Sequence, residues 1–206
     1  FNPDKIDKKQ QKLYKNKLSI HDHDLILSYL GALGTWYLLD EMLLFYKQLL
    51  TIKPNSKFLF ITQEYPETII KKTQKLNIDP QKIIVYKSTR REVPLLLSLS
   101  NLSIFFILPA FSKKASSPTK MGEIMAMGVP LICNRGIGDA ENIINTTDAG
   151  ILINNFSDDE FHTALEQVNI LLAKDKNEIR TNAEIFFSLT EGVKNYDAVY
   201  STLNSS

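Results

Sequence analysis

Short apolar runs alternate along the chain with longer amphipathic segments. Six runs have the length and flanking residues of buried strands: 25–30, 57–62, 82–86, 103–108, 129–133 and 150–153. They lack the polar alternation of a half-exposed strand, as expected when helices cover both faces of a sheet. A segment with helical spacing follows each run, so the pattern predicts alternating strands and helices.

The helical segments complete this prediction. They span 36–50, 66–76, 92–100, 119–127, 140–145, 157–173, 176–189 and 191–203. Alternation of β and α predicts an α/β protein, here a single Rossmann-like domain whose open parallel sheet of about six strands has helices on both faces. Residues 1–20 are polar and basic, and they predict a connector or hinge ahead of a domain spanning 21–206. We expect the chain to be part of a longer protein.

Composition narrows the range of partners and compartments. The net charge of the 206 residues is +1, so binding to nucleic acid or acidic lipid would require a local patch. Basic and aromatic residues are not interleaved as in nucleic-acid binders, so no such partner is expected. The single cysteine, Cys133, excludes an internal disulfide and fits a reducing, cytoplasmic compartment. No apolar run approaches the 18 residues of a membrane span.

The loops after the strands are the places to look for a ligand site, because open parallel sheets bind ligands outside the carboxyl ends of their strands. After the first run comes GALGTWY, in which Gly31 and Gly34 permit close backbone approach. The helix expected after Thr35 would add free N–H groups for an anion. The alternative is a tight turn without a ligand.

A second candidate is the stretch SSPTKMGEIMAMGVPLICN, residues 116–134. Ser116 or Ser117 is expected to cap a helix whose first residue is Pro118 and which ends at Gly128. An apolar stripe of Met121, Ile124 and Met125 is expected to face the sheet.

Lys120 and Glu123 lie three residues apart on a different face of that helix. Lys120 could offer an ammonium group to a phosphate, and Glu123 could accept two hydrogen bonds from a ribose diol. The alternative is an exposed Lys120–Glu123 ion pair that contributes only tenths of a kcal/mol.

Two further loops carry cations. Arg135 precedes Gly136 and Gly138 after the fifth run, and it is a second possible phosphate partner. Lys87, Arg90 and Arg91 form a small basic patch after the third run. In each case the alternative is a solvated surface.

The sequence shows no pattern typical of a metal site or of a catalytic nucleophile. His21, His23 and His162 show no metal-ligand spacing with cysteines or carboxylates, and no Asp-x-Asp pair is placed to hold a divalent ion. The sequence contains neither a Ser/His/Asp pattern nor a Walker loop. We therefore expect no metal and no cofactor.

Together these motifs resemble the C-terminal domain of a GT-B glycosyltransferase of the family-4, or group 1, type. The resemblance is strongest over SSPTKMGEIMAMGVPLICNRGIGDAENIINTTDAGILI, and it extends to the closing FFSLTEGVKNYDAVYSTL. It implies a site for a nucleotide-diphosphate sugar, bound as donor substrate. By the same resemblance Glu123 holds the donor ribose, and Lys87 to Arg90 lie where the base binds. The diphosphate-facing elements are then the turn Gly31, Gly34 and Thr35 and the loop Ser116, Ser117, Thr119 and Lys120.

The resemblance also implies a whole enzyme larger than this domain. A missing N-terminal domain would bind a glycan or lipid-linked acceptor, and the full-length protein could associate with the inner face of a membrane. The fragment alone is then expected to be inactive.

The sequence departs from the family pattern at two places. Ala115 stands where many members have a second glutamate, and the first glycine turn contains no cation. The diphosphate charge would then be met by Lys120, Arg135, Lys113 or Lys114 and by backbone N–H groups. Two alternatives stay open: a non-catalytic docking module, or half of a sugar-nucleotide epimerase.

Overall fold

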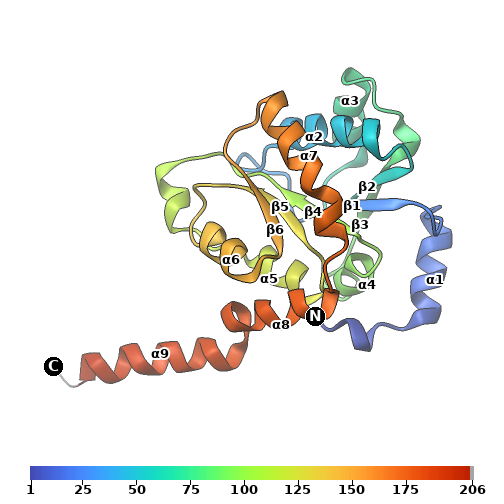
Figure 1. Ribbon diagram of the computed structural model, residues 1–206. Helices are drawn as coiled ribbons and strands as arrows, with labels where there is room; N and C mark the ends of the chain where they lie inside the picture. The colour runs from blue at the N-terminus through green and yellow to red at the C-terminus, as the bar shows by residue number, and fades with distance from the viewer. Residues whose placement is uncertain (205–206) are drawn as a thin grey trace.

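The protein is a six-stranded parallel sheet between two layers of helices (Figure 1). The computed structural model describes residues 1–204. The strand order is β3-β2-β1-β4-β5-β6, with bounds β1 (Leu25–Leu30), β2 (Ser56–Thr62), β3 (Ile83–Lys87), β4 (Leu102–Phe105), β5 (Leu131–Asn134) and β6 (Gly150–Ile153). The predicted α/β fold and parallel sheet are confirmed.

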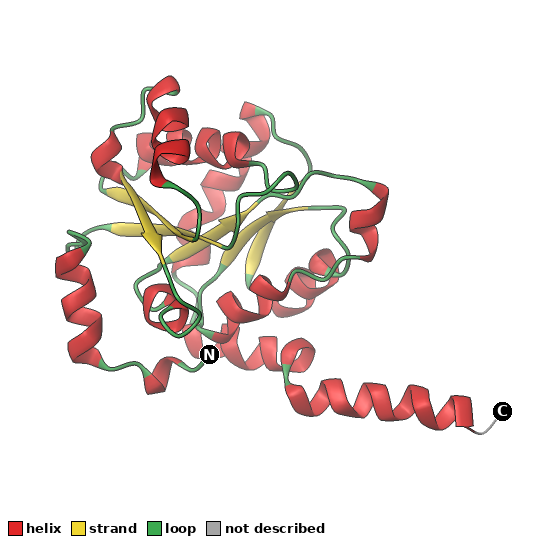
Figure 2. Cartoon of the chain, turned by 180° about the vertical axis from the view of Figure 1, so that it is seen from behind, coloured by secondary structure: helices red, strands yellow, loops and turns green. Residues whose placement is uncertain are grey.

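Helices cover both faces of the sheet (Figure 2). One face carries α2 (Leu39–Ile52), α3 (Pro66–Lys75) and α7 (Asp158–Leu172). The other face carries α4 (Val93–Leu97), α5 (Thr119–Ala126), α6 (Ala140–Thr147) and α8 (Lys176–Phe187). At the two ends of the chain lie α1 (Lys8–Lys17), which packs on α4, and α9 (Leu189–Asn204). Short 3₁₀ turns occupy Pro3–Lys5, Pro80–Lys82 and Phe111–Ala115.

The centre of the sheet is fully buried, as its apolar runs require. In β1 the side chains of Ile26, Leu27 and Tyr29 are almost inaccessible to solvent. This strand pairs with β2 along its whole length and with β4 on its other side, where Leu27 is in register with Leu102. The order of the strands therefore reverses between β1 and β4. In folds of this type ligands bind at the carboxyl ends of the strands beside that reversal.

The start of α2 differs from the prediction. The helix was expected from Trp36, but it begins at Leu39. Tyr37 instead forms a bridge with Ile107, and the N–H of Leu38 donates to the carbonyl oxygen of Phe106 at 3.0 Å. Because these backbone groups pair with the segment after β4, they are unavailable to a helix. Residues 31–38 therefore form a loop.

The start of α5 also differs. The expected cap by Ser116 or Ser117 is wrong, because Pro118 is the N-cap residue and no side chain bonds to the first helical N–H groups. The Ser117 hydroxyl lies 3.2 Å from the carboxylate of Asp139 instead. The other end agrees with the prediction, since Gly128 follows the C-cap residue Met127 with a positive φ of 68°.

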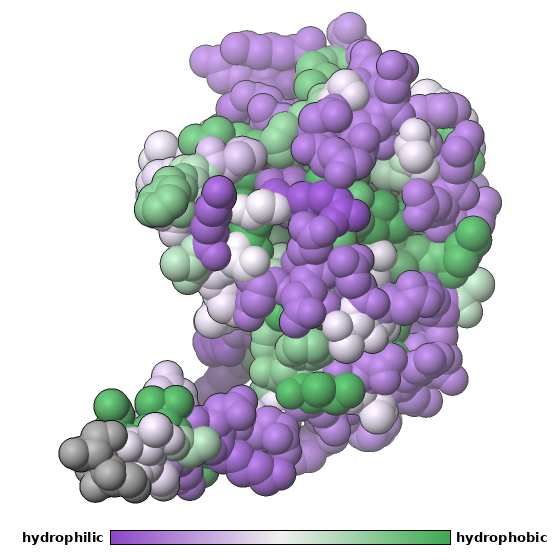
Figure 3. Space-filling view, turned by 60° about the vertical axis from the view of Figure 1, so that its left-hand side comes forward, coloured by the Kyte–Doolittle hydropathy of each residue, from purple (hydrophilic) through white to green (hydrophobic). Residues whose placement is uncertain are grey.

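The last helix extends away from the domain (Figure 1). Between Leu189 and Leu203 no side chain of α9 is buried, although apolar residues recur along it. They form part of the arm at the lower left of Figure 3, and the exposed ones are Leu189, Val193, Tyr196, Val199, Tyr200 and Leu203. No helix within residues 1–204 combines the length and apolarity needed to cross a membrane.

Candidate functional site

Gly31 and Lys120 meet at the carboxyl edge of the sheet, where β1 lies beside β4. Gly31 directly follows β1 with a φ of 118°, a backbone conformation that favours glycine. A methyl group placed on Gly31 would lie 2.8 Å from Nζ of Lys120, which stands in the first turn of α5. The absence of a side chain at position 31 therefore creates the space that the Lys120 ammonium group occupies.

Aromatic groups surround this ammonium group. Lys120 Nζ lies 3.6 Å from the ring centre of Tyr37, 4.6 Å from that of Tyr29 and 5.9 Å from that of Phe105. It also lies 3.3 Å from the hydroxyl oxygen of Tyr29. Ring faces attract a cation within about 6 Å of their centres, so they compensate in part for the lost water.

Burial makes the charge of Lys120 unusually sensitive to its surroundings. The residue is only 9% exposed, and no carboxylate of the described residues forms an ion pair with it. Burial lowers the pKa of Lys120 to about 7, and the charge of Glu123 opposes only part of this effect. An anion bound at the Gly31 turn would favour the charged form of this amine.

Glu123 is bound to Arg90 rather than to Lys120. One Glu123 carboxylate oxygen lies 2.5 Å from the guanidinium group of Arg90, in the middle of the β3–α4 loop. The Glu123 side chain is 19% exposed, whereas that of Arg90 is 66% exposed. The hydrogen bond to Glu123 raises the pKa of Arg90, which stays charged. The exposed Lys120–Glu123 ion pair considered from the sequence is therefore wrong.

A cavity of about 360 Å³ lies beside Glu123, between α5 and α8. Its walls are Phe1, Thr119, Gly122, Glu123, Ala126, Arg180, Ala183, Glu184 and Phe187. Gly31 and Lys120 do not line it, so the two charged residues of α5 serve different sides of the helix. Arg90 also contacts the Phe1 ring, at 4.7 Å from its centre, at the rim of this cavity.

The loop between β5 and α6 supports the segment that leads into α5. Gly138 approaches that segment so closely that a methyl group on it would lie 1.6 Å from the carbonyl oxygen of Ser116. Its N–H also donates to the carbonyl oxygen of Lys113 at 2.9 Å. Arg135 forms an ion pair with Glu141, but its buried Nε has no hydrogen-bond partner. Arg135 thus has one buried donor that is left unpaired.

The remaining predicted residues are more widely distributed. Gly34 and Thr35 are exposed on the loop that follows the Gly31 turn, and Thr119 is the exposed first residue of α5. The Lys87 ammonium group lies 3.9 Å from the ring centre of Tyr65, on the β3 side of the sheet. Lys113 covers the ring of Trp36 at 4.3 Å from its centre. Two pairs of the predicted residues lie directly against each other: Lys120 and Gly31, and Glu123 and Arg90.

Three residues at this edge were not identified from the sequence. Tyr29 and Tyr37 enclose Lys120, and Asn134 holds the segment after β4 by accepting from the N–H and donating to the carbonyl oxygen of Ile107. Tyr29 looked like an ordinary core residue because it lies inside an apolar run. Its position two residues before the glycine turn was the one sequence feature that could have indicated a place in the site.

Comparison with known proteins adds to this geometry. A family model described as glycosyl transferases group 1 matches residues 10–185. The chain belongs to this family. All the site residues except Phe1 and Phe187 lie in the matched part of the chain. No curated protein sequence matches the chain.

Several solved structures share the fold of this chain. WaaG, a glycosyltransferase involved in lipopolysaccharide biosynthesis, has a TM-score of 0.69 at 19% identity, over 91% of this chain and 50% of WaaG. A Rickettsia africae glycosyltransferase has a TM-score of 0.71 at 16% identity, over 97% of this chain and 53% of the Rickettsia protein. The C-terminal domain of LpcC from Francisella tularensis, a glycosyl transferase group 1 family protein, has a TM-score of 0.59 at 16% identity. The match covers 89% of this chain and 90% of the LpcC domain.

These similarities define the architecture of the chain. The fold is that of one Rossmann-like domain of a GT-B glycosyltransferase. The chain spans about half the length of WaaG and of the Rickettsia protein, but nearly the whole of the LpcC domain.

Proposed function

We propose that this chain is the donor-binding domain of a glycosyltransferase and binds a nucleotide-diphosphate sugar at the carboxyl edge of the sheet. The transferred sugar is proposed to enter a cell-surface polysaccharide or glycoconjugate. A separate N-terminal domain would bind the acceptor, and the reaction would take place in the cytoplasm.

The observation that carries this proposal is the buried cation at the Gly31 turn. A lysine without a carboxylate partner is costly to bury, and a bound anion would offset that cost. The first N–H groups of α5 are left without a side-chain cap beside it, and such groups attract phosphates. The diphosphate is therefore assigned to Lys120, the Gly31 turn and the start of α5, with Arg135 as a further cation.

The ribose is assigned to Glu123. Its carboxylate can accept hydrogen bonds from both hydroxyls of a ribose, each contributing roughly 1.5–3 kcal/mol where water is excluded. In the structure Arg90 holds this carboxylate at 2.5 Å. Because Arg90 is the more exposed of the two, its side chain can move toward the base or a phosphate when the ribose binds.

The first prediction tests this assignment through Glu123→Gln. The substitution keeps the size of the side chain but removes its charge, so nucleoside diphosphate affinity should fall about tenfold or more, since 1.4 kcal/mol corresponds to one decade. Calorimetric titration with UDP, GDP and ADP measures this change. Melting temperature should change little, because the pairing with an exposed Arg90 contributes little to folding.

Glu184→Gln is the matched control, because Glu184 lines the same cavity from α8. It should bind nucleotide as the wild type does. Equal affinities for wild type and Glu123→Gln would remove Glu123 from the site. If none of the three nucleotides binds the wild type, the chain is instead a docking module of GT-B fold.

A further inference from the structure

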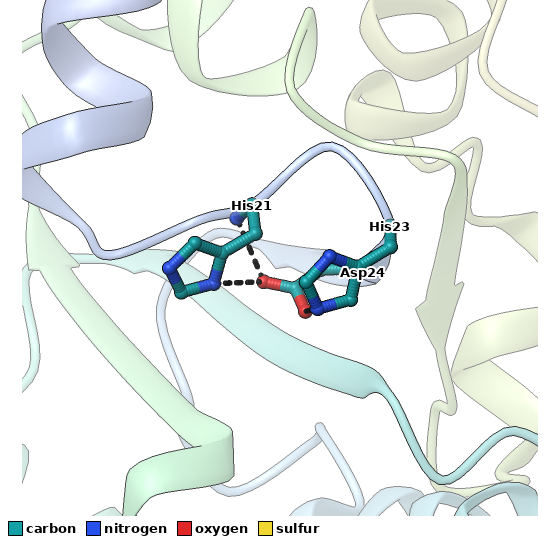
Figure 4. A group of neighbouring side chains, drawn as sticks. All are labelled: His21, His23 and Asp24. Atoms are coloured by element: carbon teal, nitrogen blue, oxygen red, sulfur yellow. Dashed lines mark hydrogen bonds and ion pairs between the residues drawn. The ribbon is translucent and has the colours of Figure 1, made fainter.

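A second cluster of polar side chains lies at the other end of β1 from Gly31. Residues 18–24 connect α1 to β1, and His21, His23 and Asp24 come together there (Figure 4). One nitrogen or carboxylate oxygen from each residue lies within 4.8 Å of the others. The sequence predicted no metal site at these histidines. In the structure, the turn between them brings both imidazole rings to the carboxylate of Asp24.

The separations between these atoms suit ligands of a single ion. His21 Nδ1 lies 3.4 Å from Asp24 Oδ2, and His23 Nε2 lies 3.6 Å from Asp24 Oδ1. Tetrahedral zinc, with bonds of about 2.0–2.2 Å, places its ligand atoms roughly 3.3–3.6 Å apart. The two imidazole rings are stacked, with centres 5.4 Å apart.

The carboxylate of this cluster is held in place. Asp24 is 5% exposed, and its Oδ2 accepts from the N–H of His21 at 2.8 Å and lies 2.9 Å from Nζ of Lys57. Asp24 is therefore an oriented anion, as metal-binding carboxylates require. The ammonium group of Lys57 opposes a second cation, so the site is expected to be weak and exchangeable.

An ion can reach this cluster from solvent. The side chains of His21 and His23 are 63% and 69% exposed, and a cavity of about 180 Å³ is lined in part by His21, Asp22 and Asp24. That space admits water molecules to complete the coordination. Two imidazoles and one carboxylate form a ligand set that suits zinc better than the oxygen-seeking ions magnesium and calcium.

We propose that His21, His23 and Asp24 bind one zinc ion, with water as the remaining ligand. This site lies at the amino end of β1, so it is separate from the nucleotide site and does not rest on the proposed function. A bound ion would fix the connection between α1 and β1, and it would raise the thermal stability of the domain.

Titration of the full chain, free of any histidine tag, with zinc chloride tests the proposal. Calorimetry should give one ion per chain, and cobalt(II) in place of zinc should give the intense visible absorption of a four-coordinate ion. The variant with both His21→Ala and His23→Ala should bind zinc at least about tenfold more weakly. Because both side chains are mostly exposed, its melting temperature without metal should equal that of the wild type.

His162→Ala is the matched control, since His162 is equally exposed and lies 3.7 Å from a carboxylate, that of Glu166, but has no second histidine beside it. It should bind zinc as the wild type does, with the same increase in melting temperature. Equal zinc affinity of the wild type and the double variant would overturn the proposal, and so would a cobalt spectrum of six-coordinate type in the wild type.

Discussion

The Lys120 ammonium group is buried against aromatic rings, so its charge depends on pH in a range where surface lysines stay protonated. The groups that face it are Tyr29, Tyr37 and Phe105, together with the nearby carboxylate of Glu123. Burial raises the pKa of both tyrosines, so they remain neutral. Protonation of this pocket therefore depends on Lys120 itself.

Folding stability should depend on pH through this residue. The pKa of Lys120 is about 7 in the folded protein and about 10.4 in an unfolded chain. Between these values the unfolded chain binds the extra proton, so stability rises with pH by up to ~1.4 kcal/mol per unit. Urea unfolding at pH 7.5 and 8.5 should show this gain in the wild type, and Lys120→Met should lack it. The exposed Lys114→Met should retain the gain.

Nucleotide binding should take up a proton at the same residue. At pH 8, Lys120 is mainly uncharged in the folded protein without ligand. A diphosphate bound beside it would favour the protonated ammonium form. Calorimetric titration with UDP in buffers of different ionisation enthalpy should therefore report close to one proton bound per nucleotide. Lys120→Met should report close to none. Uptake that is equal in both proteins would place the diphosphate elsewhere.

At the scale of elements, the sequence predicted the positions of the strands and the starts of most helices. Apolar runs located all six strands, because burial on both faces leaves a strong signal. The start of α2 and the expected cap of α5 were wrong because partners distant in sequence decide them: Ile107 for Tyr37, and Asp139 for Ser117. The aromatic enclosure of Lys120 was missed for the same reason.

The contact between the β5–α6 loop and the segment before α5 can be tested with two glycines. Gly138 and Gly136 both have positive φ, so alanine at either costs roughly 1–2 kcal/mol of strain. Only Gly138→Ala would also clash, with the carbonyl oxygen of Ser116, whereas a methyl group on Gly136 meets nothing within 4 Å. Gly138→Ala should therefore lose clearly more stability, and more nucleotide affinity, than Gly136→Ala. Urea unfolding and UDP titration give both values, and equal losses would show that the contact is unimportant.

At the scale of the whole molecule, charge neutralisation for a diphosphate would rely, in the proposed site, on Lys120, Arg135 and backbone N–H groups. Nucleotide affinity should therefore be unchanged by EDTA, measured by titration with UDP before and after chelation. The same treatment should lower the melting temperature of zinc-loaded protein, because the histidine cluster lies at the other end of β1. A strict requirement of UDP binding for magnesium or manganese would contradict the first expectation.

The short separation between Gly31 and Lys120 also constrains how this protein can evolve. Two positions 89 residues apart in sequence share one small volume, so a side chain at position 31 would push the Lys120 ammonium group away from the rings unless a shorter residue had replaced the lysine. The reverse dependence is weaker, since the φ of 118° keeps favouring glycine at position 31 whatever stands at 120. In a lineage that abandons this pocket, the lysine should therefore disappear first and the glycine should outlast it.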